Sequence, residues 1–199
     1  LGTADAGPVT SSHDYWGSVQ DYTSCSTNKF MHIDTVNTDW RDNAMLNDVC
    51  DNAAGGHNGN SISSTKVFTH SMGTLIFAKA IESGKCSLAS NSEWYAVVGP
   101  NTGSKAADWA VSLCEPNAEW VLRQIAGWLG YCDGNVAAAS IASLTTDLDY
   151  SDVTSTVTAN ADGIMCGAKA YGLNTMYSVG LDAIDAFING WRGSPRDGE

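Results

Sequence analysis

The chain has 199 residues, enough for one domain of ordinary size, and 43% of them are hydrophobic, so it can bury a substantial core. Acidic residues outnumber basic ones by 22 to 10, and the formal net charge of -12 repels the phosphates of nucleic acids and of anionic membranes. We therefore expect no nucleic-acid partner. The longest apolar runs, 94–98 and 136–144, are far shorter than the ~20 residues of a membrane-spanning helix, so we expect no transmembrane segment.

Six cysteines are widely spaced and never form a C-x-x-C pair, which favours disulfides over a zinc site or dithiol redox chemistry. Six cysteines allow fifteen pairings, among which Cys25 with Cys50 and Cys114 with Cys132 would close local loops. Residues 1–5 lack the basic start and apolar stretch of a signal peptide, so any such segment is expected to have been removed. We predict a secreted or extracellular protein.

Up to residue 98, short apolar runs alternate with stretches of helical period, which predicts an α/β fold with a mostly parallel sheet and flanking helices. In chain order, the predicted elements are a strand at 29–33, a helix capped by Asp39, a strand at 66–70, a helix that ends near Gly84, and a strand at 94–98. The last two strands and the helix between them form one βαβ unit.

Beyond residue 98 the pattern changes to helices, predicted at 104–114, 117–129 and 136–144, and then to a Thr/Ser/Asp-rich stretch that reaches 158. Helices that follow the carboxyl end of a sheet strand lie where α/β enzymes bind their ligands. We interpret 100–160 as a helical cap or lid inserted in a single domain that spans 1–199. An ordinary helical layer is the alternative. A short strand at 164–166 and a helix at 176–191 complete the prediction.

Ser71 lies at the junction of a predicted strand and a predicted helix. A serine hydroxyl needs exposure, a base, and donors aimed at the oxyanion that forms when it attacks a carbonyl. A sharp strand-to-helix turn provides the exposure and one donor, the N–H of the next residue, and it requires small neighbours. Gly73 meets that requirement and Met72 supplies the N–H. Thr69 occupies the position where glycine is commonest, so its β-branched side chain is expected to crowd the turn.

Residues 67–75, Val-Phe-Thr-His-Ser-Met-Gly-Thr-Leu, resemble the nucleophile elbow of lipases and esterases of the α/β-hydrolase superfamily. The core His-Ser-Met-Gly is the most specific part, and the resemblance extends over the βαβ unit. It implies hydrolysis of a small-molecule or lipid ester through an acyl-enzyme at Ser71, with no cofactor. Residues 1–3 resemble the segment that follows a His-Gly pair in this family, which implies that the N–H of Leu1 is the second oxyanion donor.

A general base for Ser71 is harder to find. In this family an acid and then a histidine follow the nucleophile, but no histidine occurs after His70. The side chain of His70 leaves the turn in another direction, and we interpret His32 and His57 as structural. His13 would lie beyond the oxyanion loop, near the mouth of the site, and is a candidate site contact.

Two candidates for the acid, Asp162 and Asp197, each precede a glycine in a turn of the kind that presents a carboxylate after a strand. Asp197 lies in the family order, near the end of the chain. The simplest hypothesis is that the chain is an excerpt of a larger hydrolase that lacks a flanking strand, the His-Gly pair and the triad histidine. The alternative is a non-catalytic binding or structural protein that keeps the fold without a base.

Two further patterns resemble ligand-binding loops but fail in spacing. In 99–105 the second glycine of a phosphate-binding loop comes one residue early, so we expect no nucleotide. Asp147, Asp149 and Asp152 imitate the start of a calcium loop that lacks its glycine and final glutamate, so we expect no metal ion.

Overall fold

The computed structural model of the chain describes residues 7–11, 16–55, 60–128 and 130–166. The helix predicted at 176–191 lies outside these residues.

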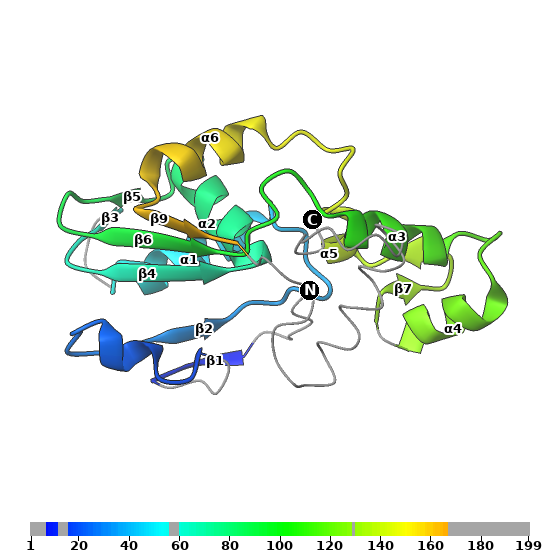
Figure 1. The fold of residues 1–199 in the computed structure, drawn as a ribbon, viewed down its shortest axis with the longest axis horizontal. Coiled ribbons are helices and arrows are strands. Elements are labelled where there is room, and N and C mark those ends of the chain that lie inside the picture. Colours follow the sequence, from blue (N-terminus) through cyan, green and yellow to red (C-terminus); the bar gives the residue numbers. More distant parts are fainter. Residues whose placement is uncertain (1–6, 12–15, 56–59, 129, 167–199) are drawn as a thin grey trace.

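A three-stranded parallel sheet forms the centre of the fold (Figure 1). Its strands, in spatial order, are β4 (Lys66–His70), β6 (Glu93–Val97) and β9 (Gly163–Met165). His70 is in register with Val97, and Val97 with Met165, so all three carboxyl ends meet at one edge. The predicted α/β class with a parallel sheet is confirmed, and β4 begins and ends at the predicted residues.

Helix α2 joins β4 to β6 and forms the apolar centre of the molecule. Three helices pack together here: α2 (Met72–Glu82), α1 (Asn43–Ala53) and α6 (Ser151–Asn160). Because α2 packs against the sheet and against both other helices, Leu75, Ile76 and Ala78 are all fully buried. Trp94 and Ala96 of β6 meet it from the sheet. The helix ends before Gly84, whose φ of +71° is the left-handed conformation that glycine favours.

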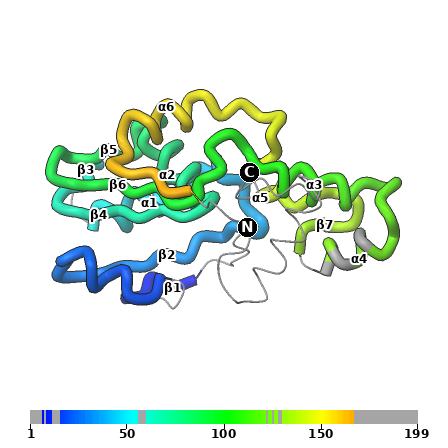
Figure 2. The backbone as a smooth tube through the Cα atoms, viewed as in Figure 1, coloured from blue at the N-terminus to red at the C-terminus, as the bar shows by residue number. Residues whose placement is uncertain are grey.

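The N-terminal part differs from the prediction in two respects. Strand β2 (Phe30–His32) does not join the parallel sheet but pairs antiparallel with β1 (Gly7–Thr10), below β4 in Figure 2. Helix α1 is capped by Asp42, whose carboxylate accepts a hydrogen bond from Met45 N at 3.0 Å, and not by Asp39. The carboxylate of Asp39 instead accepts from the backbone N and Nε of Arg41. Residues 19–22 form a short 3-10 helix, η2 (Val19–Tyr22).

Two short strands extend the β4 and β6 pair toward its amino end. They are β3 (Ser61–Ile62) and β5 (Ser87–Leu88), and they run parallel. Between these short strands and the main sheet, side chains replace the backbone pairing. Asn91 accepts a hydrogen bond from the backbone N–H of Ser64, and Ser92 accepts one from that of Thr65.

The segment from 100 to 160 divides into two parts. Helix α6 covers the sheet beside α2, whereas the rest packs as a separate group at the right of Figure 1. The members of this group are α3 (Lys105–Cys114), α4 (Trp120–Trp128), the antiparallel pair β7 (Cys132–Asp133) and β8 (Val136–Ala137), and α5 (Ala139–Ala142). Helices α3 and α4 lie within their predicted ranges.

One prediction for this segment is wrong, and one helix was not predicted. The helix predicted at 136–144 is the β8 strand followed by the four-residue α5, because Gly134, with φ +62°, turns the chain back into a hairpin. The Thr/Ser/Asp-rich stretch, to which the sequence assigned no element, contains most of α6. Its Thr156 and Thr158 hydroxyls donate to carbonyls four residues earlier, and Val153 and Val157 are buried.

Two disulfides link neighbouring elements, Cys50–Cys86 and Cys114–Cys132. The predicted pairing of Cys114 with Cys132 is confirmed. The pairing of Cys25 with Cys50 is wrong, because α1 packs along α2 and brings Cys50 to Cys86, just beyond the end of α2. In the described parts of the chain, no helix is long and apolar enough to cross a bilayer.

Peptide mapping without reduction tests the two disulfide pairings. We expect cross-linked peptides for Cys50–Cys86 and for Cys114–Cys132. The double variant Cys50→Ala/Cys86→Ala should lower the free energy of unfolding by about 2–4 kcal/mol, because the bridge restricts the unfolded chain. A peptide that joins Cys25 to Cys50 would contradict the packing of α1 on α2.

Candidate functional site

Ser71 forms the turn between β4 and α2 in a strained backbone conformation. Its φ of +52° and ψ of -131° lie in a region that residues with a Cβ avoid, at a cost of about 1–3 kcal/mol. The N–H of Ser71 donates to the carbonyl of Val97 at 3.0 Å, and the N–H of Thr74 donates to the carbonyl of Ser71 at 2.9 Å. These bonds fix the turn to both the sheet and the helix. The half-buried serine therefore lies at the carboxyl edge of the sheet.

The first turn of α2 offers two backbone donors beside Ser71. Within the described residues, the N–H groups of Met72 and Gly73 donate to no protein acceptor, as is usual at the start of a helix. The side chain of Met72 is buried, with 2% of its surface exposed, so its backbone is held in place. A Cβ added at Gly73 would meet no described atom within 4 Å, apart from its chain neighbours and the nearby backbone of its own helix. The arrangement suits an anion or a developing oxyanion.

Thr69 does not crowd the turn, contrary to the expectation from the sequence. Its side chain points into the core, where Oγ1 accepts a hydrogen bond from Trp94 Nε1 at 2.9 Å and lies 3.1 Å from Thr74 Oγ1. A glycine at this position would leave the buried indole N–H without that acceptor. The threonine at this position therefore has a structural reason.

A second strained residue lies at the same edge. Val98, directly after β6, has a φ of +49°, which is rare for a β-branched residue, and its N–H donates to Met165 O at 2.7 Å. The next residue is Gly99, where an added Cβ would lie 2.7 Å from the Cβ of Thr74. The loop after β6 thus packs tightly against the first turn of α2. Sequence reasoning missed both features, because Val98 carries no local signal for this conformation.

Asp162 lies at the other end of the sheet and is not brought to Ser71. Its carboxylate accepts a hydrogen bond from Trp94 N at 2.8 Å, near the amino end of β6, whereas Ser71 is bonded to Val97 at the carboxyl end. At a rise of ~3.3 Å per residue, these positions on β6 are about 10 Å apart along the strand. The prediction of Asp162 as the acid is corrected: its carboxylate fixes the start of β9.

The histidine next to Ser71 packs against an aromatic ring. His70 is half-buried and meets Trp16 edge to face, with ring centroids 6.2 Å apart. Burial lowers the pKa of His70 from 6.5 to about 4, so the imidazole is neutral at pH 7. The other described histidine, His32, lies in β2 opposite Gly7.

No side chain among the described residues makes a hydrogen bond to the Ser71 hydroxyl. The other predicted site residues, Leu1, His13 and Asp197, lie outside the described part of the chain, as does His57. Trp16, three residues after His13, contacts His70, the residue that precedes Ser71.

The described residues contain no group of three or more His, Cys, Asp or Glu side chains that could hold a metal ion. Comparisons of the chain with protein-family models, with curated proteins and with solved structures found no match.

The contact of Gly99 with Thr74 predicts that alanine destabilises the protein at position 99 but not at a glycine with free space around it. Gly99→Ala should lower the free energy of unfolding by about 1–3 kcal/mol, because the added methyl overlaps Thr74. The matched control is Gly127→Ala in α4, where the nearest atom to an added Cβ is 3.9 Å away, so it should be neutral or stabilising. Urea denaturation measures both. Equal effects would show that the loop is not packed against α2 in solution.

The environment of His70 predicts its titration. We expect an NMR titration of its ring protons in the folded protein to have a midpoint near pH 4. Because the unfolded chain binds this proton near pH 6.5 and the folded chain does not, His70 should make stability fall as the pH decreases from 6.5 to 4. His70→Gln should remove this part of the pH dependence. A midpoint near 6.5 would mean that the ring is solvated.

Proposed function

We propose that the chain is a serine-dependent ester hydrolase of α/β-hydrolase type, with Ser71 as the nucleophile. The observation that carries the proposal is the strained backbone of Ser71, φ +52°, at a strand-to-helix turn whose next two N–H groups have no described acceptor. Strain of this kind persists only where the surrounding structure enforces it, and it is frequent at functional sites. The resemblance of residues 67–75 to the lipase and esterase elbow agrees with this geometry.

The proposed reaction has two steps. The Oγ of Ser71 attacks the carbonyl carbon of an ester, a base accepts the hydroxyl proton, and the carbonyl oxygen becomes an oxyanion that the N–H of Met72 stabilises. The carbon–oxygen bond to the alcohol then breaks, the alcohol takes the proton, and Ser71 carries the acyl group. Water then attacks the acyl-enzyme in the same way, which releases the acid and restores the Ser71 hydroxyl. The chemistry requires no cofactor, and the substrate is a small-molecule or lipid ester.

The remaining members of the site belong to parts of the chain outside the described residues. Asp197 is the proposed acid, in the order that the family uses, and the N–H of Leu1 is the proposed second oxyanion donor. His13 is the proposed site contact, and the packing of Trp16 on His70 supports its location near the turn. The group of α3, α4 and the β7–β8 hairpin follows the carboxyl edge of β6, which suits a cap over the site. The two disulfides fit a secreted protein.

A non-catalytic binding protein with the same fold is the second candidate. It is favoured by one observation, namely that no described side chain accepts or donates a hydrogen bond at the Ser71 hydroxyl. A serine without a base is a weak nucleophile. Covalent labelling distinguishes the two functions.

A fluorophosphonate probe should label the protein, and Ser71→Ala should abolish the labelling, because the phosphonate forms its bond with the activated hydroxyl. The control is Ser155→Ala on the exposed side of α6, which should be labelled as the wild type is. Labelling is detected by gel fluorescence and assigned by peptide mass spectrometry. An unlabelled wild type, with both variants equally inert, would exclude the hydrolase and favour the binding protein.

A further inference from the structure

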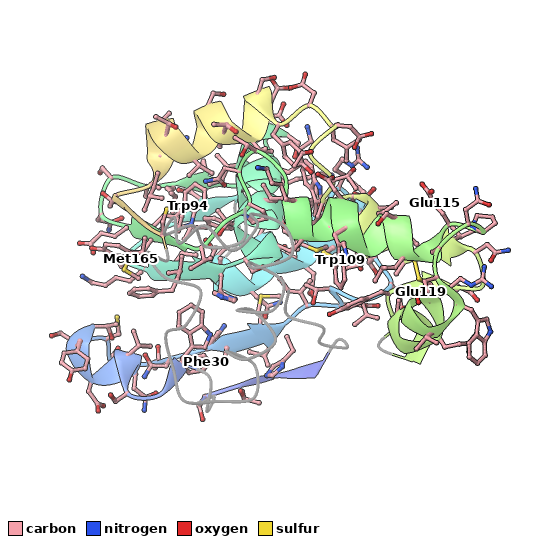
Figure 3. The ribbon with its side chains drawn as sticks, turned by 45° about the vertical axis from the view of Figure 1, so that its right-hand side comes forward. Phe30, Trp94, Trp109, Glu115, Glu119 and Met165 are labelled. Atoms are coloured by element: carbon pink, nitrogen blue, oxygen red, sulfur yellow. A yellow bond between two sulfur atoms is a disulfide. The ribbon has the colours of Figure 1, made fainter. Side chains whose placement is uncertain are left out.

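Three side chains from three elements meet inside the turn that carries Ser71. Thr69 of β4, Thr74 of α2 and Trp94 of β6 form what we call the Thr69 junction. Thr69 is 8% exposed, and the other two are completely buried. In Figure 3, Trp94 lies in the sheet half of the molecule, far from Glu115 and Glu119 at the opposite end. Hydrogen bonds are stronger in such a dry interior than at the surface.

The Thr69 junction connects the residues before Ser71 to the residues after it. Thr69 precedes Ser71 by two residues and Thr74 follows it by three, and their hydroxyl oxygens are 3.1 Å apart. The indole N–H of Trp94 is only a donor, so the Thr69 oxygen must accept it, at 2.9 Å. One oxygen therefore joins the strand before Ser71 to the helix after it and to the neighbouring strand. Gly99 packs against the methyl side of Thr74 and limits its movement.

Such a connection matters because the conformation of Ser71 is strained. If the two arms of the turn could separate, the backbone would relax toward a common conformation, and Ser71 Oγ and Met72 N–H would both move. Catalysis is sensitive to displacements of this size, since a shift of about 1 Å can reduce a rate by a factor on the order of one hundred. The residue that the sequence marks as a departure from the family, Thr69, is thus the one that connects the turn.

We propose that the Thr69 hydroxyl is a positioning group for the nucleophile. The inference rests on the proposed function, because its consequence is the rate at which Ser71 is acylated. Thr69 does not touch the substrate. It acts through the backbone of Ser71 and Met72.

Inactivation kinetics with the fluorophosphonate probe test the proposal. Thr69→Val keeps the shape and removes the hydroxyl, whereas Thr69→Ser keeps the hydroxyl. Thr156→Val is the matched control, because Thr156 is also 8% exposed and its hydroxyl is bonded within α6. We expect the maximal rate of inactivation to fall roughly ten- to a hundredfold in Thr69→Val, with the probe concentration for half-maximal rate unchanged. Thr69→Ser should recover most of the rate, and Thr156→Val should match the wild type.

Circular dichroism should establish a temperature at which all variants are folded. A wild-type rate for Thr69→Val, or an equal loss in Thr156→Val, would overturn the proposal. If Thr69→Val does not fold, Thr74→Val replaces it, since that variant breaks the bond across the turn and keeps the bond from Trp94. A smaller loss is then expected, and a wild-type rate would overturn the proposal.

A wild type that the probe does not label would refute the proposed function but not the junction. In that case hydrogen exchange at the amides of Ser71 and Thr74 decides, because their hydrogen bonds to the carbonyls of Val97 and Ser71 hold the turn. Exchange should be faster in Thr69→Val than in Thr156→Val, because the turn is no longer connected across its base. Equal exchange in the two variants would overturn the role of Thr69.

Discussion

The backbone of Ser71 has to pass from an extended strand to a helix within one residue, and it does so at a φ of +52°. That conformation is unfavourable for any residue with a Cβ, so neighbouring groups must supply the free energy that maintains it. Here they are the Ser71 N–H bond to Val97, the hydroxyl contact of Thr69 with Thr74, and the close approach of Gly99 to the first turn of α2. The first and the last of these depend on the parallel pairing of β4 with β6.

The register of the sheet decides which residues can take part in chemistry at this turn. Because β4, β6 and β9 are parallel, the residues that follow them lie along one edge, and those that precede them lie at the other. Asp162 precedes β9 and therefore binds Trp94 at the amino edge. A side chain of this sheet region that serves Ser71 has to follow a strand and not precede one. This geometric condition, which no short motif expresses, excludes Asp162.

Local patterns in the sequence predicted the βαβ unit well, because its strands are short apolar runs and α2 carries a strong helical period that Gly84 ends. They failed where the decisive contact was distant in the chain. Asp39 has the chemistry of a helix cap, but Arg41 occupies its carboxylate. No helix was predicted at α6, yet Val153 and Val157 bury one face of this helix, and its hydroxyls bond to its own carbonyls. The position of Ser71 could be predicted because it follows from a local motif. The contact of Thr69 could not be predicted, because its hydroxyl oxygen accepts a hydrogen bond from Trp94, which is 25 residues away in the chain.

The most direct test of Ser71 as a nucleophile is a crystal structure of the protein after reaction with a phosphonate. A covalent bond should join Ser71 Oγ to phosphorus, the phosphonyl oxygen should lie about 2.7–3.1 Å from Met72 N, and the φ of Ser71 should stay near +52°. A phosphonyl oxygen directed away from Met72 N, or a serine relaxed to a negative φ, would contradict an oxyanion site built on the strained turn.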